Sequence, residues 1–185
     1  MTELTRLVKA AQRGDRLAFG ELYGRYARMV HGILLSRARP ADVDDLVQDV
    51  FITAMQRLGS LREPEAFGGW LKTMARHRAA DHIRRSPQTF ELTDAVAEST
   101  AATTPDRAEA LAALEAIRSL PDAYRETLVL RLVEGMTGPE IAERTGLTHA
   151  SVRVNLHRGM QMLRERLKSP YERGLSLGSN RRAGS

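Results

Sequence analysis

The sequence lacks cysteine and has no long apolar run. The absence of cysteine from all 185 residues excludes disulfides, thiolate catalysis and cysteine-based zinc sites. No apolar run approaches the roughly 20 residues that span a bilayer. The N-terminus, MTELTRLVKAAQRGD, is too polar for a signal peptide. We therefore expect a soluble cytoplasmic protein with no membrane insertion.

Aromatic residues and strand-like patterns are also scarce. Aromatics make up only 5% of the chain, and no stretch alternates apolar and polar residues as a half-buried strand would. Residues that favour helices, such as Ala, Leu, Arg and Glu, are abundant. The expected fold class is all-α.

The helical patterns fall into two groups separated by a segment of different composition. Residues 87–106 contain acids but no Lys or Arg, and many Ser, Thr and Ala, which is typical of a flexible linker. We expect small helical domains at 1–86 and 107–168, and a disordered tail at 169–185. Helices are predicted at about 3–13, 16–37, 41–58, 65–85, 107–118, 122–133, 138–145 and 149–167. Asp15 has the chemistry to cap the second of these helices, and the apolar spacing places Tyr23 of the second helix and Ile83 of the fourth toward the core.

The C-terminal group contains the pattern of a helix-turn-helix. Thr137 and Glu140 have the spacing of a capping box, and Gly146 permits a tight turn before the last helix. In such a unit the second helix enters the major groove of DNA. We therefore predict that the C-terminal domain is a helix-turn-helix.

The last helix has one apolar and one polar side. Val152 and Leu156 are four residues apart and form a buried stripe, whereas Arg153 and His157 lie on another side. Residues 148–168 carry a net charge of +4, from five basic residues and one acid. Arginine pairs with guanine, and Asn155 has the chemistry to pair with adenine. A solvated basic face is the alternative, but the helix-turn-helix setting favours DNA reading.

A second basic helix lies in the first group. Residues 70–85 also carry a net charge of +4, and Trp70 begins the segment. Aromatic and basic residues together suit unstacked bases, because an aromatic face stacks on any base. The alternative is that Trp70 is a core residue.

The helix before it is acidic. Asp42, Asp45 and Asp49 share one side of the segment 42–51, which contains no basic residue. A metal site is disfavoured because no second kind of ligand accompanies the carboxylates. A solvated acidic face and a docking surface for a basic protein remain as interpretations.

Two other classes of function fit the sequence less well. An enzyme is disfavoured because the five histidines show no triad or metal spacing and no glycine-rich phosphate loop is present, so no catalytic residue, metal or cofactor is predicted. A stand-alone helix-turn-helix regulator would account for 107–168 but not for the two charged helices before it. Such a regulator usually dimerises, and the sequence has no dimerisation heptads.

Three stretches together resemble the sigma-70 family of RNA polymerase sigma factors, specifically the extracytoplasmic-function (ECF) group. They are DDLVQDVF, WLKTMARHRAADHIRR and LPDAYRETLVLRLVEGMTGPEIAERTGLTHASVRVNLHR, and the resemblance covers about 1–168. It implies an alternative sigma factor that binds the clamp helices and flap of core RNA polymerase and recognises promoter DNA. It also implies regulation by an anti-sigma factor, which the sequence itself does not show.

The resemblance assigns residues to three surfaces. Core-polymerase binding falls to Asp44, Asp45, Gln48, Asp49 and Phe51. Binding of the −10 element falls to Trp70, Arg76, His77, Asp81, Arg84 and Arg85. Binding of the −35 element falls to His149, Ser151, Arg153, Val154, Asn155, His157 and Arg158.

Three of these residues depart from the family pattern. His77 stands where many members have Asn, Val154 where a small hydroxyl residue is usual, and Asn155 where a basic residue is usual. The base preferences of relatives therefore do not transfer to this chain.

Overall fold

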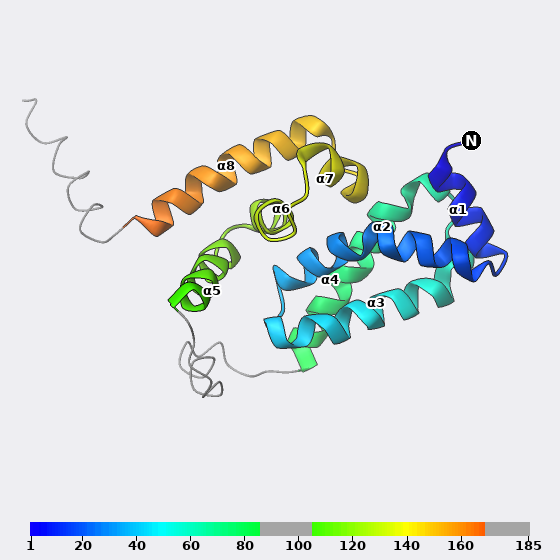
Figure 1. The fold of residues 1–185 in the computed structure, drawn as a ribbon, viewed down its shortest axis with the longest axis horizontal. Coiled ribbons are helices and arrows are strands. Elements are labelled where there is room, and N and C mark those ends of the chain that lie inside the picture. The colour runs from blue at the N-terminus through cyan, green and yellow to red at the C-terminus, as the bar shows by residue number, and fades with distance from the viewer. Residues whose placement is uncertain (86–104, 169–185) are drawn as a thin grey trace, which may run out of the picture.

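The computed structural model describes residues 1–85 and 105–168, and every α-helix within these ranges lies close to its expected position (Figure 1). The expected linker and C-terminal tail lie almost entirely outside the described residues. No strand occurs in the described part of the chain, so the all-α prediction is confirmed. The N-terminal domain contains α1 (Glu3–Gln12), α2 (Arg16–Leu35), α3 (Val43–Arg57) and α4 (Phe67–Arg85), and the C-terminal domain contains α5 (Pro105–Arg118), α6 (Asp122–Leu132), α7 (Gly138–Thr145) and α8 (His149–Leu167).

Local sequence signals fix several helix ends. The Asp15 carboxylate accepts hydrogen bonds from the backbone N–H groups of Leu17 and Ala18 and so caps α2. The capping box of Thr137 and Glu140 begins α7. Gly146 ends α7 with φ of +71°, a left-handed conformation that glycine adopts without steric cost. These signals were read from the sequence and are confirmed.

The N-terminal domain is built around α2. Leu22, Tyr26, Met29 and Ile33 of α2 are fully buried against the other helices of this domain and the C-terminal domain. Tyr23, which was expected to point inward, is 44% exposed because it lies at the border of the buried stripe of α2. Its ring centroid lies 4.5 Å from that of Phe51.

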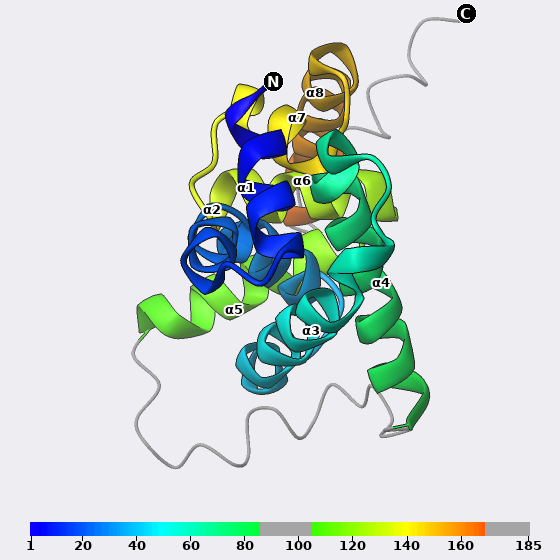
Figure 2. The same ribbon diagram turned by 90° about the vertical axis from the view of Figure 1, so that its right-hand side faces the viewer.

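Ile83 was also expected to point inward and is 38% exposed. It belongs to the last turn of α4, which extends past the body of the bundle (Figure 2). The apolar stripe of α4 is buried from Phe67 to Ala79, and Ile83 lies one turn beyond this buried part.

The C-terminal domain is organised by α6, which packs against α5, α7 and α8. Ile141 and Ala142 of α7 are buried with Val152 of α8, and Leu147 in the turn packs against the same core. This is the predicted helix-turn-helix arrangement.

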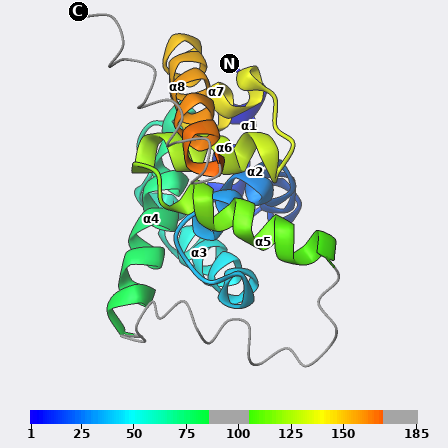
Figure 3. The ribbon, with the colours of Figure 1, turned by 90° about the vertical axis from the view of Figure 1, so that its left-hand side faces the viewer.

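The two domains lie against each other. Helix α6 packs along α2, and α7 packs against both α2 and α4. Helix α8 lies beyond α6, on the side of the molecule opposite α3 (Figures 1 and 3). The second helix of the helix-turn-helix and the acidic helix α3 therefore lie on opposite sides of the molecule.

Candidate functional site

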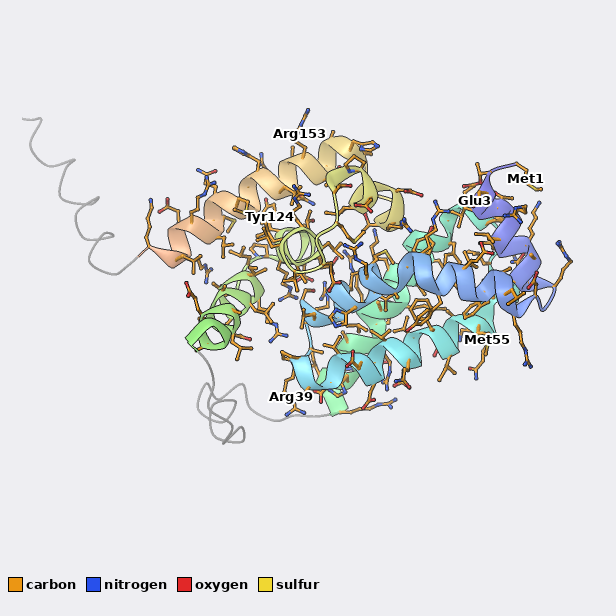
Figure 4. All side chains as sticks on the ribbon, viewed as in Figure 1. Met1, Glu3, Arg39, Met55, Tyr124 and Arg153 are labelled. Atoms are coloured by element: carbon orange, nitrogen blue, oxygen red, sulfur yellow. The ribbon has the colours of Figure 1, made fainter. Side chains whose placement is uncertain are left out.

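The outer face of α8 presents a group of exposed basic and apolar side chains. Arg153, Val154, His157 and Arg158 are all exposed, and Arg153 points away from the rest of the molecule (Figure 4). Among the residues that the structure describes, neither arginine has an ion-pair partner. Their charge is therefore available to an external anion.

Other predicted members of this surface have roles inside the domain. Thr148 caps α8 by accepting a hydrogen bond from the backbone N–H of Ser151, and the two hydroxyls lie 2.8 Å apart. The amide nitrogen of Asn155 lies 3.5 Å from the Thr127 hydroxyl of α6. Asn155 therefore lies toward the domain and at the edge of the surface, whereas His149 is exposed at its N-terminal end.

Most of the predicted −10 residues share one face of α4. Trp70, His77, Asp81 and Arg84 recur at spacings of seven, four and three residues, which places them in one row along the helix. His77 and Arg84 are exposed, Asp81 forms an ion pair with Arg84, and Arg85 lies exposed beside them at the helix end. Trp70 is partly buried, with its ring centroid 5.9 Å from that of Phe67. The tryptophan thus contributes to the core and still has an accessible part.

Arg76 lies on a different face of α4. Its guanidinium turns toward the C-terminal domain and pairs with Glu126 of α6, with 2.6 Å between Nη2 and Oε2. Arg76 is therefore separated from the row that begins at Trp70.

The acidic helix α3 divides its carboxylates between two sides. Asp44, Asp45 and Gln48 are exposed, whereas Asp49 forms an ion pair with Arg78 of α4. Asp42 precedes the helix and accepts hydrogen bonds from Arg39 and from His82 of α4. The hydrogen bond from Arg39 lowers the pKa of Asp42 below its ordinary value, with a smaller contribution from His82. Two of the three acids predicted on one side therefore serve contacts within the domain.

The exposed side of α3 continues as an apolar surface. Ile52 and Met55 are 50% and 56% exposed and follow Asp44 and Gln48 along the helix. Met55 points outward, away from the C-terminal domain (Figure 4). Phe51 is buried against Tyr23, so it supports this surface from beneath rather than forming part of it.

Sequence reasoning missed a group of polar residues between the domains. The side chain of Glu126 is buried and accepts hydrogen bonds from both Arg37, which follows the end of α2, and Arg76 of α4. Lys72 of α4 donates a hydrogen bond to the carbonyl of Thr145. The only available signal was a glutamate among the apolar residues of α6, and that signal does not identify its partners.

Two kinds of feature are absent from residues 1–85 and 105–168. No group of three or more His, Asp or Glu side chains is placed to hold a metal ion. No helix in the described ranges is long and apolar enough to cross a membrane.

Comparison with known proteins gives consistent matches over both domains. Residues 22–88 match Sigma-70 region 2, and residues 110–163 match Sigma-70 region 4. The RNA polymerase sigma factor CarQ of Myxococcus xanthus is 31% identical over 83% of this chain and 91% of its own. The ECF RNA polymerase sigma factor BldN of Streptomyces coelicolor is 30% identical over 85% of this chain, but the match spans only 63% of BldN.

A solved structure supports the fold. The structure of CnrH in complex with the cytosolic domain of CnrY is similar with a TM-score of 0.58 and 25% identity, covering 87% of this chain and 94% of CnrH. The two regions occur in the same order as the two domains described above. The chain therefore belongs to the ECF group of the sigma-70 family of RNA polymerase sigma factors.

Proposed function

We propose that this sigma factor binds core RNA polymerase through the exposed side of α3. Asp44, Asp45 and Gln48 provide a polar and negatively charged part, and Ile52 and Met55 an apolar part. An apolar patch beside complementary charge fits a basic helical partner, because burial supplies affinity and charge supplies orientation. The clamp helices of the largest polymerase subunit are the partner that the family resemblance names for this helix, and the flap is a further part of core polymerase that it names.

The −10 element is assigned to α4 on the exposure of one row of side chains. An accessible part of Trp70 and the exposed His77 offer ring faces to an unstacked base, with Arg84 and Arg85 placed for phosphates at the helix end. His77 is titratable and larger than the Asn that many family members have at this position. The base preference of α4 is therefore specific to this chain.

The −35 element is assigned to α8. The observation that carries this proposal is the exposed, unpaired basic face of the second helix of a helix-turn-helix. Arg153 and Arg158 supply donors for guanine or phosphate, and Val154 is exposed where it would contact a thymine methyl group.

The chain is further proposed to act in the cytoplasm by binding rather than by catalysis, under the control of an anti-sigma factor. CnrH, whose fold is similar, was solved in complex with the cytosolic domain of CnrY. A comparable protein partner for this chain would need to cover the polymerase-binding or DNA-binding surfaces described above.

The decisive experiment is reconstitution with core RNA polymerase on a library of promoter fragments. Wild-type protein should form a stable complex and produce sequence-selective transcripts. Asp45→Lys should weaken the complex, because it reverses charge at an exposed position of α3 that makes no ion pair within the described residues. Glu21→Lys, an equal charge change at an exposed position of α2, is the matched control. Polymerase-independent binding to duplex DNA with no complex would favour a stand-alone regulator instead.

A further inference from the structure

Helix α1 carries a basic stripe that belongs to none of the surfaces described above. Arg6, Lys9 and Arg13 are exposed and lie three and four residues apart, so they share the side of the helix opposite its buried residues. The match to Sigma-70 region 2 begins only at residue 22, so it gives this stripe no role.

The basic stripe has no counter-charge within the part of the chain that the structure describes. None of its three side chains forms an ion pair with another described residue. The two acids nearest to them in the sequence are already bound, since Glu3 lies 3.6 Å from Arg25 and Asp15 caps α2. Exposed cations without neutralising partners create a positive potential, which attracts an external anion.

The segment that joins α3 to α4 fixes the position of α1. Glu65 in this segment accepts a hydrogen bond from the Thr5 hydroxyl. The side-chain amide of Gln12 donates a hydrogen bond of 2.8 Å to the carbonyl oxygen of Leu61. Lys9 lies between Thr5 and Gln12 at helical spacing, so the basic stripe borders the side of α1 that faces this segment.

The same segment leads directly into α4, and α1 lies beside the start of that helix (Figure 2). Trp70 is in the first turn of α4 and begins the row assigned to the −10 element. A DNA strand that follows this row as far as Trp70 therefore leaves α4 next to α1. The basic stripe is about 10 Å long, which matches about three phosphate steps of a stacked strand.

We propose that the basic stripe of α1 binds the phosphates of the unpaired promoter strand where it continues past the −10 element. DNA on the other side of this element must reach α8 as duplex, so the strand over α1 is the one that runs toward the transcription start. The contacts add affinity without base preference, because the phosphate is the same at every position. This inference rests on the proposed assignment of the −10 element to α4.

Two fork-shaped promoter probes test the proposal with the full chain bound to core RNA polymerase. The short probe ends its single strand at the −10 element, and the long probe extends the same strand toward the transcription start. The wild-type complex should bind the long probe more tightly. The triple variant Arg6→Gln, Lys9→Gln and Arg13→Gln should lose this gain but bind the short probe as the wild type does.

The salt dependence of binding gives the size of the effect. Three phosphate contacts with a single strand add about 2 to the slope of log affinity against log salt concentration. A fourfold rise in salt concentration should therefore cost the wild type roughly 20-fold more affinity for the long probe than it costs the triple variant.

The matched control keeps the charge at the same three positions. The variant Arg6→Lys, Lys9→Arg and Arg13→Lys should bind both probes as the wild type does. Glutamine favours helix, so the triple glutamine variant should keep its helicity, which circular dichroism measures. A long probe with uncharged methylphosphonate linkages in its extension removes the charges from the DNA instead, and the unaltered protein should then gain nothing from the extension.

Three results would overturn the inference. The extension adds no affinity for the wild type, the triple variant gains as much from it as the wild type does, or the triple variant binds core polymerase less tightly without DNA. The last result would assign the basic stripe to an acidic surface of polymerase. Failure of the proposed function is distinguishable, because it would appear as no polymerase complex or no sequence-selective binding of the short probe.

Discussion

At the scale of single residues, Arg153 provides the sharpest test of promoter reading. Its side chain projects from α8 away from every other element (Figure 4). If it pairs with a guanine, Arg153→Ala should cost roughly 1–3 kcal/mol on the cognate −35 element and relax the preference at one position. Polymerase binding to promoters with single −35 substitutions would measure this.

Arg164→Ala is the matched control for Arg153. Arg164 is also exposed on α8 but lies three turns closer to its C-terminal end. Its removal should weaken binding by a similar amount on every sequence, as expected for a phosphate contact, or have no effect. If Arg153→Ala behaves in the same way, Arg153 contacts phosphate and another residue reads the base.

Individual residues also show which features the sequence predicts and which it does not. The exposure of Arg153 and His157 followed from helical periodicity, because Val152 fixed which side of α8 is buried. The pairing of Arg76 with Glu126 did not follow, since the two are 50 residues apart and belong to different domains. A basic residue on an amphipathic helix looks the same in sequence whether it faces DNA or a buried carboxylate.

At the scale of elements, the turn between α7 and α8 depends on Gly146. Its φ of +71° is unfavourable for residues with a Cβ atom. Gly146→Ala should lower the free energy of unfolding of the C-terminal domain by roughly 1–2 kcal/mol, and the change is measurable by denaturant unfolding followed by circular dichroism.

Gly20→Ala is the corresponding control within α2. Gly20 has a helical φ, and a Cβ there would have no atom within 4 Å. Removing backbone freedom should stabilise the N-terminal domain by roughly 0.5–1 kcal/mol. Equal effects at Gly20 and Gly146 would contradict the role assigned to the turn.

Elements were more predictable than their packing. The bounds of α7 followed from the capping box and Gly146, which are local signals. The inward direction of Ile83 was wrong because periodicity gives the side of a helix but not how far its neighbours extend. The inward direction of Tyr23 was wrong for a related reason, since this residue lies at the border of the buried stripe of α2.

At the scale of the whole molecule, the contact between domains was beyond sequence reasoning. The N-terminal and C-terminal domains were each expected from their own helical patterns. The contact between them depends on close backbone approach at Gly32 and Gly68 and on ion pairs that link distant positions. Glycine and arginine at these positions have several ordinary explanations, so only the three-dimensional arrangement identifies their shared role.

The domain contact should also respond to pH through His31. Its Nδ1 lies 2.6 Å from a carboxylate oxygen of Glu134 in the C-terminal domain, and this hydrogen bond raises the pKa of His31 above 6.5, with Asp44 adding a smaller contribution. The folded chain, in which the two domains are in contact, therefore binds this proton more tightly than the unfolded chain. The resulting stabilisation is fully present below the ordinary pKa and is lost as pH rises through the raised pKa.

The free energy of unfolding of the full chain, measured with denaturant across the neutral pH range at fixed ionic strength, tests this linkage. The contribution of the His31–Glu134 pair should fall with rising pH in the wild type. Glu134→Gln should remove most of that dependence, because Gln cannot stabilise the charged imidazolium as a carboxylate does. His77→Gln, at an exposed position of α4 outside the domain contact, should retain it. A wild-type profile that stays flat, or one that Glu134→Gln leaves unchanged, would show that the ion pair does not stabilise the domain contact.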